Sequence, residues 1–573
     1  MMKTNKLWQI IIYILIAGSV LAAIKVIFFD YTLDEEYQIM MSYRNLSGDK
    51  LFREMWEPHQ TSSFLCTILM WLYRTVTGTY TGVLLYLRVC TTAIQVGISF
   101  YLYKVLCGLT RKDYALLLTL TYFNIVPKII QIPEFANMQV WFFTLLVLPL
   151  LQYYQKYEER RKWNWLYPVA AGVAMSLEVL SYPTCLLLFP FFLVYIFICS
   201  KGRRWRDVLL FAGTCAASAG IWLLLVLRNL SFSDFVRNVK LLLAFDLTHE
   251  ISGATMGKGE GILVNAFWAV ILLIVCAAAG GIVLLAVKRR EKEWNAGKVI
   301  TLLATAGVIV SGVIQLVLWV VWKSGYETYQ LHLFVTVVAA LAVAGIADDR
   351  KKMLYMGILG TLVSYAVVIY ISDLQMYYAL PHGTLGVVFA VLILLYALEQ
   401  AWKEKSRILI ALVLTVFCFV CVFGKGYTLR EGRNYQVVVD TENVMKYGPA
   451  VGILTNYMNA YIYNSNYEDF SQYIRPEDTV LIVAGMVDSE STTPYMFGEN
   501  AVAHYSIVDP TAYDERLLEY WELYPEKEPD VIVVDCWYGE LKESPDNWIM
   551  QYIENSFGYT EVHDGKYVRF YRR

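Results

Sequence analysis

The segment Leu7–Phe29 reads LWQIIIYILIAGSVLAAIKVIFF, and soon after it the chain carries the acidic run Asp34-Glu35-Glu36. A helix of this length crosses a hydrocarbon layer about 30 Å thick with some tilt. The segment exceeds the apolar core of a signal peptide, and no cleavage-site pattern precedes Asp30, so we expect it to remain uncleaved. We therefore predict a transmembrane helix whose far end carries an acidic loop.

The composition of the whole chain favours a membrane protein. It has 573 residues, of which 57% are hydrophobic and 17% are charged, and its mean hydropathy is +0.45. Such a sequence buries itself in lipid instead of forming one water-soluble core. The formal net charge is −2, so no global basic field attracts nucleic acid. The region after Phe423 contains only Cys536, so we expect no disulfide within it.

Further apolar runs repeat along the chain. Together with Leu7–Phe29 they predict a polytopic α-helical protein with about thirteen transmembrane helices. The other runs are roughly Val83–Leu106, Tyr114–Ile132, Met138–Tyr154, Trp165–Tyr182, Thr184–Cys199, Val208–Leu227, Ile262–Val287, Val299–Trp322, Thr328–Ile346, Leu354–Ile371, Leu385–Ala401 and Ile408–Phe423.

The positive-inside rule decides the topology at one shorter apolar stretch, Ser62–Val76. If this stretch does not span, six basic loops all face the cytoplasm, whereas spanning would place all six outside. Their basic residues are Lys104, Arg111 and Lys112; Lys156, Arg160, Arg161 and Lys162; Lys201, Arg203, Arg204 and Arg206; Lys288, Arg289, Arg290 and Lys292; Arg350, Lys351 and Lys352; and Lys403, Lys405 and Arg407. We therefore predict a juxtamembrane helix at the outer surface, within a first outer loop over residues 30–82. The N-terminus, with Lys3 and Lys6, is then cytoplasmic, and everything after Phe423 is extracytoplasmic.

The region after Phe423 has a different pattern from the rest. Short β-rich runs are separated by helical segments such as Asp514–Tyr524, which is typical of a small α/β domain. The predicted strands are Thr479–Ala484, Ala503–Val508, Val531–Asp535 and a final hairpin in Tyr559–Tyr571. We predict a transmembrane domain over residues 1–423 and an extracytoplasmic α/β domain over residues 424–573. The second domain either captures an acceptor or caps the first, and its sequence leaves both open.

Ionisable residues inside the predicted spans collect toward the outer side. Charged groups within a membrane are costly and usually face the protein interior or a wet cavity. Those in the outer third of their spans are Arg88, Lys128, Glu178, Arg228 and His332, and those in outer loops are Glu134, Lys323 and His382. Snorkelling from helix ends explains single lysines and arginines, whereas a cavity open to the outer face explains the whole set.

The stretch from Asp34 to Phe64 reads DEEYQIMMSYRNLSGDKLFREMWEPHQTSSF. It resembles the first extracytoplasmic loop of GT-C glycosyltransferases, above all protein O-mannosyltransferases and lipid A aminoarabinose transferases. The elements that carry the resemblance are Asp34-Glu35, Tyr37, Gly48-Asp49, Glu57-Pro58 and, in the next span, Arg88. The aminoarabinose enzymes usually carry Lys-Pro-Pro after the glutamate, where this chain has Pro58-His59-Gln60.

The resemblance implies a GT-C fold and inverting transfer of a sugar from a polyprenyl-phosphate donor to an extracytoplasmic acceptor. It assigns Asp34 as the general base that takes the proton of the acceptor hydroxyl. Such transfer needs a carboxylate opposite the leaving group, within hydrogen-bond reach of the attacking hydroxyl. The leaving phosphate is a weak base and needs cations, and the candidates for this contact are Arg88, Lys128, Arg53 and His59.

The other carboxylates have supporting roles in this interpretation. Glu35 is expected to orient Asp34 or the acceptor, while Glu57, Glu134 and Glu178 are candidates for binding the acceptor or a divalent cation. Alternatively, the acidic run is the solvated first turn of a helix, where acids are favoured by the helix dipole. The sequence leaves open the donor sugar, the metal dependence, and whether the acceptor is a protein, a glycolipid or a wall polymer.

Two further function classes compete with a glycosyltransferase. A transporter or flippase of lipid-linked sugars would favour broken helices and ionisable groups near the membrane midplane, where this chain has few. A membrane sensor that displays the C-terminal domain would need neither so many spans nor an acidic loop. The outer loop Ser231–Gly261 is amphipathic and then glycine-rich, which fits either a lid over the site or a simple connector.

Overall fold

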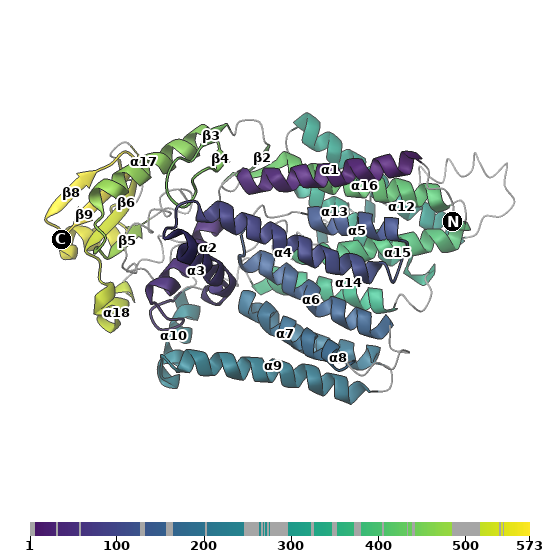
Figure 1. The fold of residues 1–573 in the computed structure, drawn as a ribbon, viewed down its shortest axis with the longest axis horizontal. Helices are drawn as coiled ribbons and strands as arrows, with labels where there is room; N and C mark the ends of the chain where they lie inside the picture. Colours follow the sequence, from purple (N-terminus) through teal and green to yellow (C-terminus); the bar gives the residue numbers. More distant parts are fainter. Residues whose placement is uncertain are drawn as a thin grey trace.

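The computed structural model describes most of the chain as a helix bundle with a small sheet region at one end (Figure 1). The described residues are 6–29, 33–56, 59–125, 132–155, 164–200, 203–245, 263–264, 267–268, 270–271, 274, 296–322, 326–346, 352–371, 380–403, 406–431, 434–437, 442–483, 516–537, 540–541 and 544–573.

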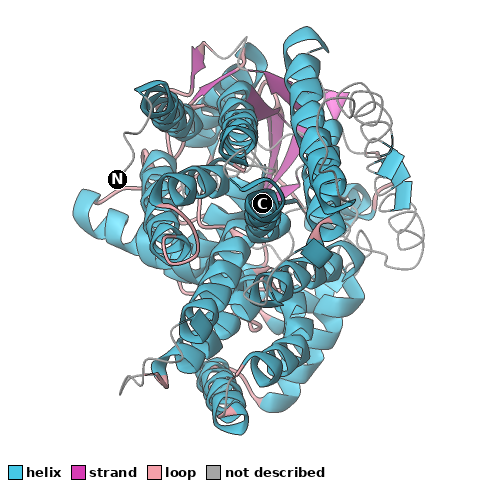
Figure 2. Ribbon diagram, turned by 90° about the vertical axis from the view of Figure 1, so that its right-hand side faces the viewer, coloured by secondary structure: helices cyan, strands magenta, loops and turns pink. Residues whose placement is uncertain are grey.

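Seven described helices are long and apolar enough to cross a membrane. They are α1 (Lys6–Phe28), α4 (Val83–Leu106), α6 (Phe135–Gln155), α9 (Arg204–Leu227), α12 (Ala296–Trp322), α15 (Thr384–Trp402) and α16 (Ser406–Tyr427). The other helices of the bundle are α5 (Lys112–Asn124), α7 (Leu166–Ser181), η2 (Pro183–Leu187), α8 (Leu188–Cys199), α13 (Tyr326–Ala342), η4 (Ala344–Ile346), α14 (Lys352–Ile371) and η6 (Leu380–Gly383). Viewed from the end away from the sheet, many of these helices are seen nearly along their axes (Figure 2). The chain is thus a multi-pass membrane protein.

Within the described residues, helices lie at the positions of the predicted spans, with one clear difference. The run Tyr114–Ile132 was expected to be one span, but α5 ends at Asn124 because Ile125 is extended. Pro127 follows two residues later, and a proline disfavours helical geometry just before it. The run Ile262–Val287 lies mostly outside the described residues, so the total of thirteen stays a prediction.

The first outer loop forms two helices, α2 (Leu33–Ser47) and α3 (Phe64–Thr77), with the short η1 (Gln60–Ser63) before α3. The 14 residues of α3 rise only about 21 Å, which is less than a hydrocarbon layer of about 30 Å. One face of α3 is buried through Cys66 and Met70, while the opposite side exposes Ile68, Trp71, Leu72 and Val76. Such a helix suits the membrane surface, and the juxtamembrane position of Ser62–Val76 stays a prediction.

The C-terminal region is built on a five-stranded sheet of order β5-β6-β9-β8, with β7 (Glu540–Leu541) pairing β6. The strand β5 (Val480–Val483) runs parallel to β6 (Val531–Trp537), and β9 (Val568–Arg572) pairs antiparallel with both β6 and β8 (Glu561–Asp564). These strands confirm three of the predicted strand positions, whereas Ala503–Val508 lies outside the described residues. The remaining elements are α10 (Phe232–Phe245), β1 (Thr428–Glu431), β2 (Asn434–Val437), β3 (Asn443–Val444), β4 (Leu454–Thr455), α17 (Tyr457–Tyr473), α18 (Arg516–Leu523), η11 (Pro525–Lys527), α19 (Trp548–Tyr552) and η12 (Ile553–Phe557).

The helix α2 packs in one apolar core with the C-terminal region. This core joins Tyr37 and Met41 of α2 to Tyr463 of α17 and to Val531 and Phe570 of the sheet, all buried. Figure 1 shows α2 and α3 between the bundle and the sheet. Backbone bonds reinforce the junction, since the amides of Gly82 and Leu84 donate to the carbonyls of Gly448 (3.0 Å) and Pro449 (3.1 Å). The C-terminal region therefore packs against the first outer loop.

Candidate active site at the first outer loop

The acidic run of the sequence forms the start of α2. Asp34 lies in the first turn of this helix, while its side chain is outside the described part of the structure. Glu35 and Glu36 follow it and are buried, with 0% and 3% of their surface exposed. The alternative of a solvated helical turn is therefore wrong for these two glutamates, because neither meets solvent.

Glu35 forms a buried ion pair with Arg88 of α4. Nη2 of Arg88 lies 2.6 Å from Oε2 of Glu35, and Nε lies 2.9 Å from Oε1, so the contact is bidentate. The second terminal nitrogen of Arg88 donates to the carbonyls of Ile27 and Phe29, both at 3.1 Å. Arg88 thereby holds the end of α1 against the start of α2. The geometry shows a positioning contact, and the expected contact between Arg88 and a donor phosphate stays a prediction.

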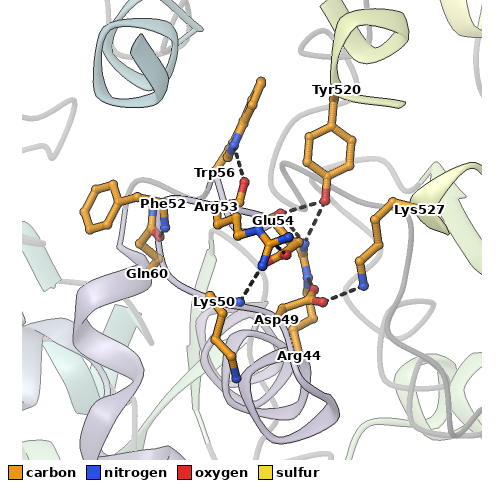
Figure 3. A network of polar contacts seen from close by, with 10 residues as sticks. All are labelled: Arg44, Asp49, Lys50, Phe52, Arg53, Glu54, Trp56, Gln60, Tyr520 and Lys527. Atoms are coloured by element: carbon orange, nitrogen blue, oxygen red, sulfur yellow. Dashed lines mark hydrogen bonds and ion pairs between the residues drawn. The ribbon is translucent and has the colours of Figure 1, made fainter. Parts of the chain in front are cut away.

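Asp49 of the Gly48-Asp49 motif is the centre of a second buried network (Figure 3). Its carboxylate accepts from Nε of Arg44 at 2.8 Å and from Nζ of Lys527 at 2.5 Å. Arg44 also donates to the carbonyl of Glu54 at 2.7 Å, and the same carbonyl accepts from the hydroxyl of Tyr520 at 2.6 Å. Two residues of the C-terminal region thus bind the loop that follows α2. Burial lowers the pKa of Lys527 more than the neighbouring Asp49 raises it.

The same loop is pinned on its other side by α9 and α10. Phe52 has a φ of 61°, in the left-handed region that non-glycine residues rarely adopt. Its ring lies against Trp222 and Phe235, with centroids at 5.8 Å and 5.2 Å. Its carbonyl accepts from Asn238 at 2.6 Å, and its amide donates to Oε1 of Gln60 at 2.7 Å. Such strain persists only where surrounding contacts over-determine the backbone.

His59 lies in an aromatic group beside this loop. Its ring stacks on Phe135 at 4.1 Å with an interplanar angle of 9°. Tyr182 lies 5.5 Å away, and Tyr37 meets His59 edge-on at 6.5 Å. The structure therefore places His59 beside α2, the start of α6 and the end of α7.

Glu178 belongs to a neighbouring buried cluster. Nε2 of Gln139 donates to Oε1 of Glu178 at 3.0 Å and to Oγ of Ser364 at 2.8 Å. Oε1 of Gln139 is hydrogen-bonded to Nδ1 of His382. His382 also meets the ring of Tyr182 edge-on at 5.7 Å, which connects this cluster to the His59 group. The structure thus brings Glu178, His382 and His59 to one region, with Tyr182 between the two histidines.

Glu134 caps the first turn of α6. Its two carboxylate oxygens accept from the amides of Ala136 at 2.8 Å and Asn137 at 2.6 Å. Glu134 is fully buried, and a buried helix start needs acceptors for its free amides. The observed role is that of a helix cap, and a role in binding an acceptor or a metal stays a prediction.

Two buried lysines near the outer end of α1 were not predicted as site residues. Nζ of Lys25 donates to the carbonyls of Lys425 (3.2 Å) and Thr428. Nζ of Lys425 donates to the carbonyl of Phe123 at 2.9 Å and lies 3.8 Å from the centroid of its ring. Both belong to strongly apolar helices, whose sequences predict membrane spans. The sequence feature that could have identified them is a basic residue in the last turn of an apolar helix.

The remaining candidates do not all join this region. Arg53 is 46% exposed through its side chain and pairs with Glu54 at 3.1 Å. Arg228 is exposed, and His332 bonds to Ser311 at 2.7 Å within the bundle. Glu57, Lys128, Lys323 and most of the glycine-rich half of Ser231–Gly261 lie outside the described residues. No group of three or more His, Cys, Asp or Glu residues in the described part is arranged to hold a metal ion.

No known family model and no curated protein matches the sequence. The structure is similar to solved structures of the oligosaccharyltransferase of Archaeoglobus fulgidus. The apo form gives a TM-score of 0.43 at 12% identity, over 93% of this chain and 70% of that one. The complex of this enzyme, AglB, with an inhibitory peptide and a dolichol-phosphate gives 0.40 at 12% identity, over 91% and 69%.

A third solved structure, the complex with Zn and sulfate, gives a TM-score of 0.47 at 13% identity, over 91% of this chain and 67% of that one. At this identity the likeness concerns the architecture alone.

Proposed function

We propose that this protein is a membrane glycosyltransferase. It transfers a sugar from a polyprenyl-phosphate donor to an acceptor on the extracytoplasmic side and inverts the anomeric centre. The observation that carries the proposal is the start of α2, where the loop that resembles GT-C enzymes is fixed to α1 and α4 by the buried Glu35–Arg88 pair. A loop held this firmly suits catalysis, because transfer depends on accurate placement of the reacting groups.

Asp34 is the general base in this proposal. It takes the proton of the acceptor hydroxyl while the hydroxyl oxygen attacks the anomeric carbon and the phosphate leaves on the opposite face. Glu35 acts through position, because its bidentate contact with Arg88 fixes the turn of α2 that contains Asp34. Arg88 is therefore proposed both as the anchor of Glu35 and, as the resemblance implies, as a group near the donor phosphate.

Cations that stabilise the leaving phosphate come from several elements. His59 and Arg53 lie in or beside the loop after α2, and Lys128 follows α5 in the sequence. We add Lys425, whose ammonium is buried at the outer ends of α16 and α5. A buried ammonium is costly, and an anionic ligand nearby offsets that cost. The donor phosphate supplies such an anion.

The acceptor side of the site is proposed to involve Glu57 and Glu178. Glu178 lies in the buried cluster with Gln139 and His382, whose amide, imidazole and carboxyl groups can bind sugar hydroxyls. Glu134 is a weaker candidate, because its carboxylate caps α6. A divalent cation stays part of the proposal, with Glu57, Glu134 and Glu178 as its candidate ligands, and transfer measured with and without a chelator tests it.

The experiment uses the full protein reconstituted in liposomes with a panel of polyprenyl-phosphate hexoses and pentoses. Turnover of one donor should release free polyprenyl phosphate and give a product with inverted anomeric configuration. Mass spectrometry of surface glycans in cells lacking the protein then identifies the acceptor. Movement of intact donor across the bilayer without any hydrolysis or transfer would contradict the proposal and favour a flippase.

A further inference from the structure

The loop between α2 and η1 is anchored by the C-terminal region, 478 residues further along the chain. Asp49 is buried between Arg44 of α2 and Lys527 of η11. Each cation binds a different oxygen of the same carboxylate, so a rotation of the Asp49 side chain would break both contacts (Figure 3). A buried carboxylate held by two charged donors is a strong and directional contact.

Aromatic packing adds to this anchor. The hydroxyl of Tyr520 donates to the carbonyl of Glu54 at 2.6 Å, while its ring meets Trp56 edge-on at 5.1 Å. Trp56 is buried in the same apolar cluster as Leu481, Ile532 and Tyr571 of the C-terminal region. A side chain of the first outer loop thus forms part of the core beneath the sheet.

The anchored loop leads directly to His59 and its aromatic group. Trp56 and His59 are separated only by Glu57 and Pro58. On the far side, Asn238 and Phe235 of α10 hold Phe52 in its unusual backbone conformation. The segment from Asp49 to Trp56 therefore contacts α10 on one side and the C-terminal region on the other.

We propose that Lys527 and Tyr520 are positioning residues, which fix the loop from Asp49 to His59 for the transfer reaction. This inference rests on the proposed function for its catalytic part, whereas the anchoring itself does not depend on it. Neither residue touches the reacting atoms. Their loss should therefore lower kcat through misplacement of the loop, and it should raise the donor KM by a smaller factor, because Arg53 and His59 of this loop are proposed phosphate contacts.

The test compares Lys527→Met and Tyr520→Phe with wild type, and Arg572→Met serves as the matched control. Arg572 forms a bidentate buried pair with Asp478 at 2.6 Å and 2.7 Å and also donates to the carbonyl of Tyr473, all within the C-terminal region. Tyr520→Phe keeps the ring against Trp56 and removes only the hydroxyl, so it should fold. Hydrogen–deuterium exchange of peptides covering residues 48–60 reports on the loop without any substrate.

We expect exchange in residues 48–60 to accelerate about tenfold in Lys527→Met and about threefold in Tyr520→Phe, but not in Arg572→Met. Transfer by Lys527→Met should show kcat lowered on the order of 10- to 100-fold, with a smaller rise in the KM for the donor. Unchanged exchange in both loop variants would overturn the inference, as would an equal loss of kcat in Arg572→Met. If exchange accelerates but wild type transfers no sugar from any donor, the anchor stands and the proposed function fails.

Discussion

Among single residues, Arg88 shows how the same side chain supports two interpretations. The sequence places an arginine near the outer end of a span, and the resemblance implies a contact with phosphate. In the structure its guanidinium is turned toward Glu35 and toward the last carbonyls of α1. Pattern alone could not reveal this, because Glu35 and Arg88 are 53 residues apart and their contact depends on how α1, α2 and α4 pack. The position of Arg88 near one end of an apolar helix was predictable, whereas its partner was not.

The buried Glu35–Arg88 pair should contribute to the stability of the protein. Arg88→Met leaves the buried carboxylate of Glu35 without its cation and should destabilise the protein by about 3–5 kcal/mol. The double variant Glu35→Gln/Arg88→Met should recover part of this loss, because no buried charge then remains unpaired. Unfolding midpoints in detergent measure both effects. A double variant less stable than either single variant would contradict the ion-pair account.

Lys527 gives a prediction about pH. Its pKa in the folded protein is lowered, chiefly by burial, so between that pKa and its value of about 10.5 in the unfolded chain the unfolded state binds more protons. The cost of burying the charged ammonium is fully present below the folded pKa and disappears as pH rises through this window. The stability of wild type relative to Lys527→Met should therefore increase between neutral pH and about pH 10. Thermal midpoints of the two proteins measure this difference, and a difference independent of pH would contradict it.

Among elements, the start of α6 shows that a carboxylate predicted as a ligand can instead cap a helix. Glu134 was singled out as a possible ligand because it is an acid in an outer loop. The structure shows both of its oxygens on backbone amides of the first turn of α6. The helix α5 shows a similar limit, since its apolar pattern runs on to Ile132 although the helix ends at Asn124. Hydropathy thus located the helices well but not their caps and ends.

The capping role predicts how α6 responds to substitution. Glu134→Ala should destabilise the protein by about 1 kcal/mol, because two amides lose their acceptors. Glu134→Asn keeps a capping oxygen and should retain most of the stability and the transfer activity. Unfolding midpoints and transfer rates of the two variants check this. Loss of activity in Glu134→Asn at normal stability would instead favour a role for Glu134 as a ligand.

For the whole molecule, the C-terminal region is part of the structure that holds the candidate site. Its strands were predictable, because Val480–Val483 and Val531–Trp537 are short runs of apolar, largely β-branched residues. Its attachment to α2 was not predictable, because Asp49 and Lys527 are 478 residues apart in the sequence. The choice between acceptor capture and a cap therefore could not be made from sequence. The structure shows the packing that a cap requires.

This arrangement predicts the effect of removing the C-terminal region after Tyr427. The truncation would expose buried side chains of α2, among them Tyr37, Met40 and Met41. Each such side chain contributes roughly 1.5–3 kcal/mol by burial, so the first outer loop should lose its fold. Limited proteolysis should then cut within residues 33–60 in the truncated protein and not in wild type. A truncated protein with a protected first outer loop would show that the region is a separate appendage.

The most direct test of the central claim is the rate of sugar transfer by Asp34→Asn, measured with the donor that wild type uses. The matched control is Asp234→Asn, which changes an acid in the first turn of another helix, α10. The account predicts that Asp34→Asn loses transfer by about 10²- to 10⁴-fold while donor binding and folding stay normal, and that Asp234→Asn retains activity. Full transfer by a correctly folded Asp34→Asn protein would contradict the account.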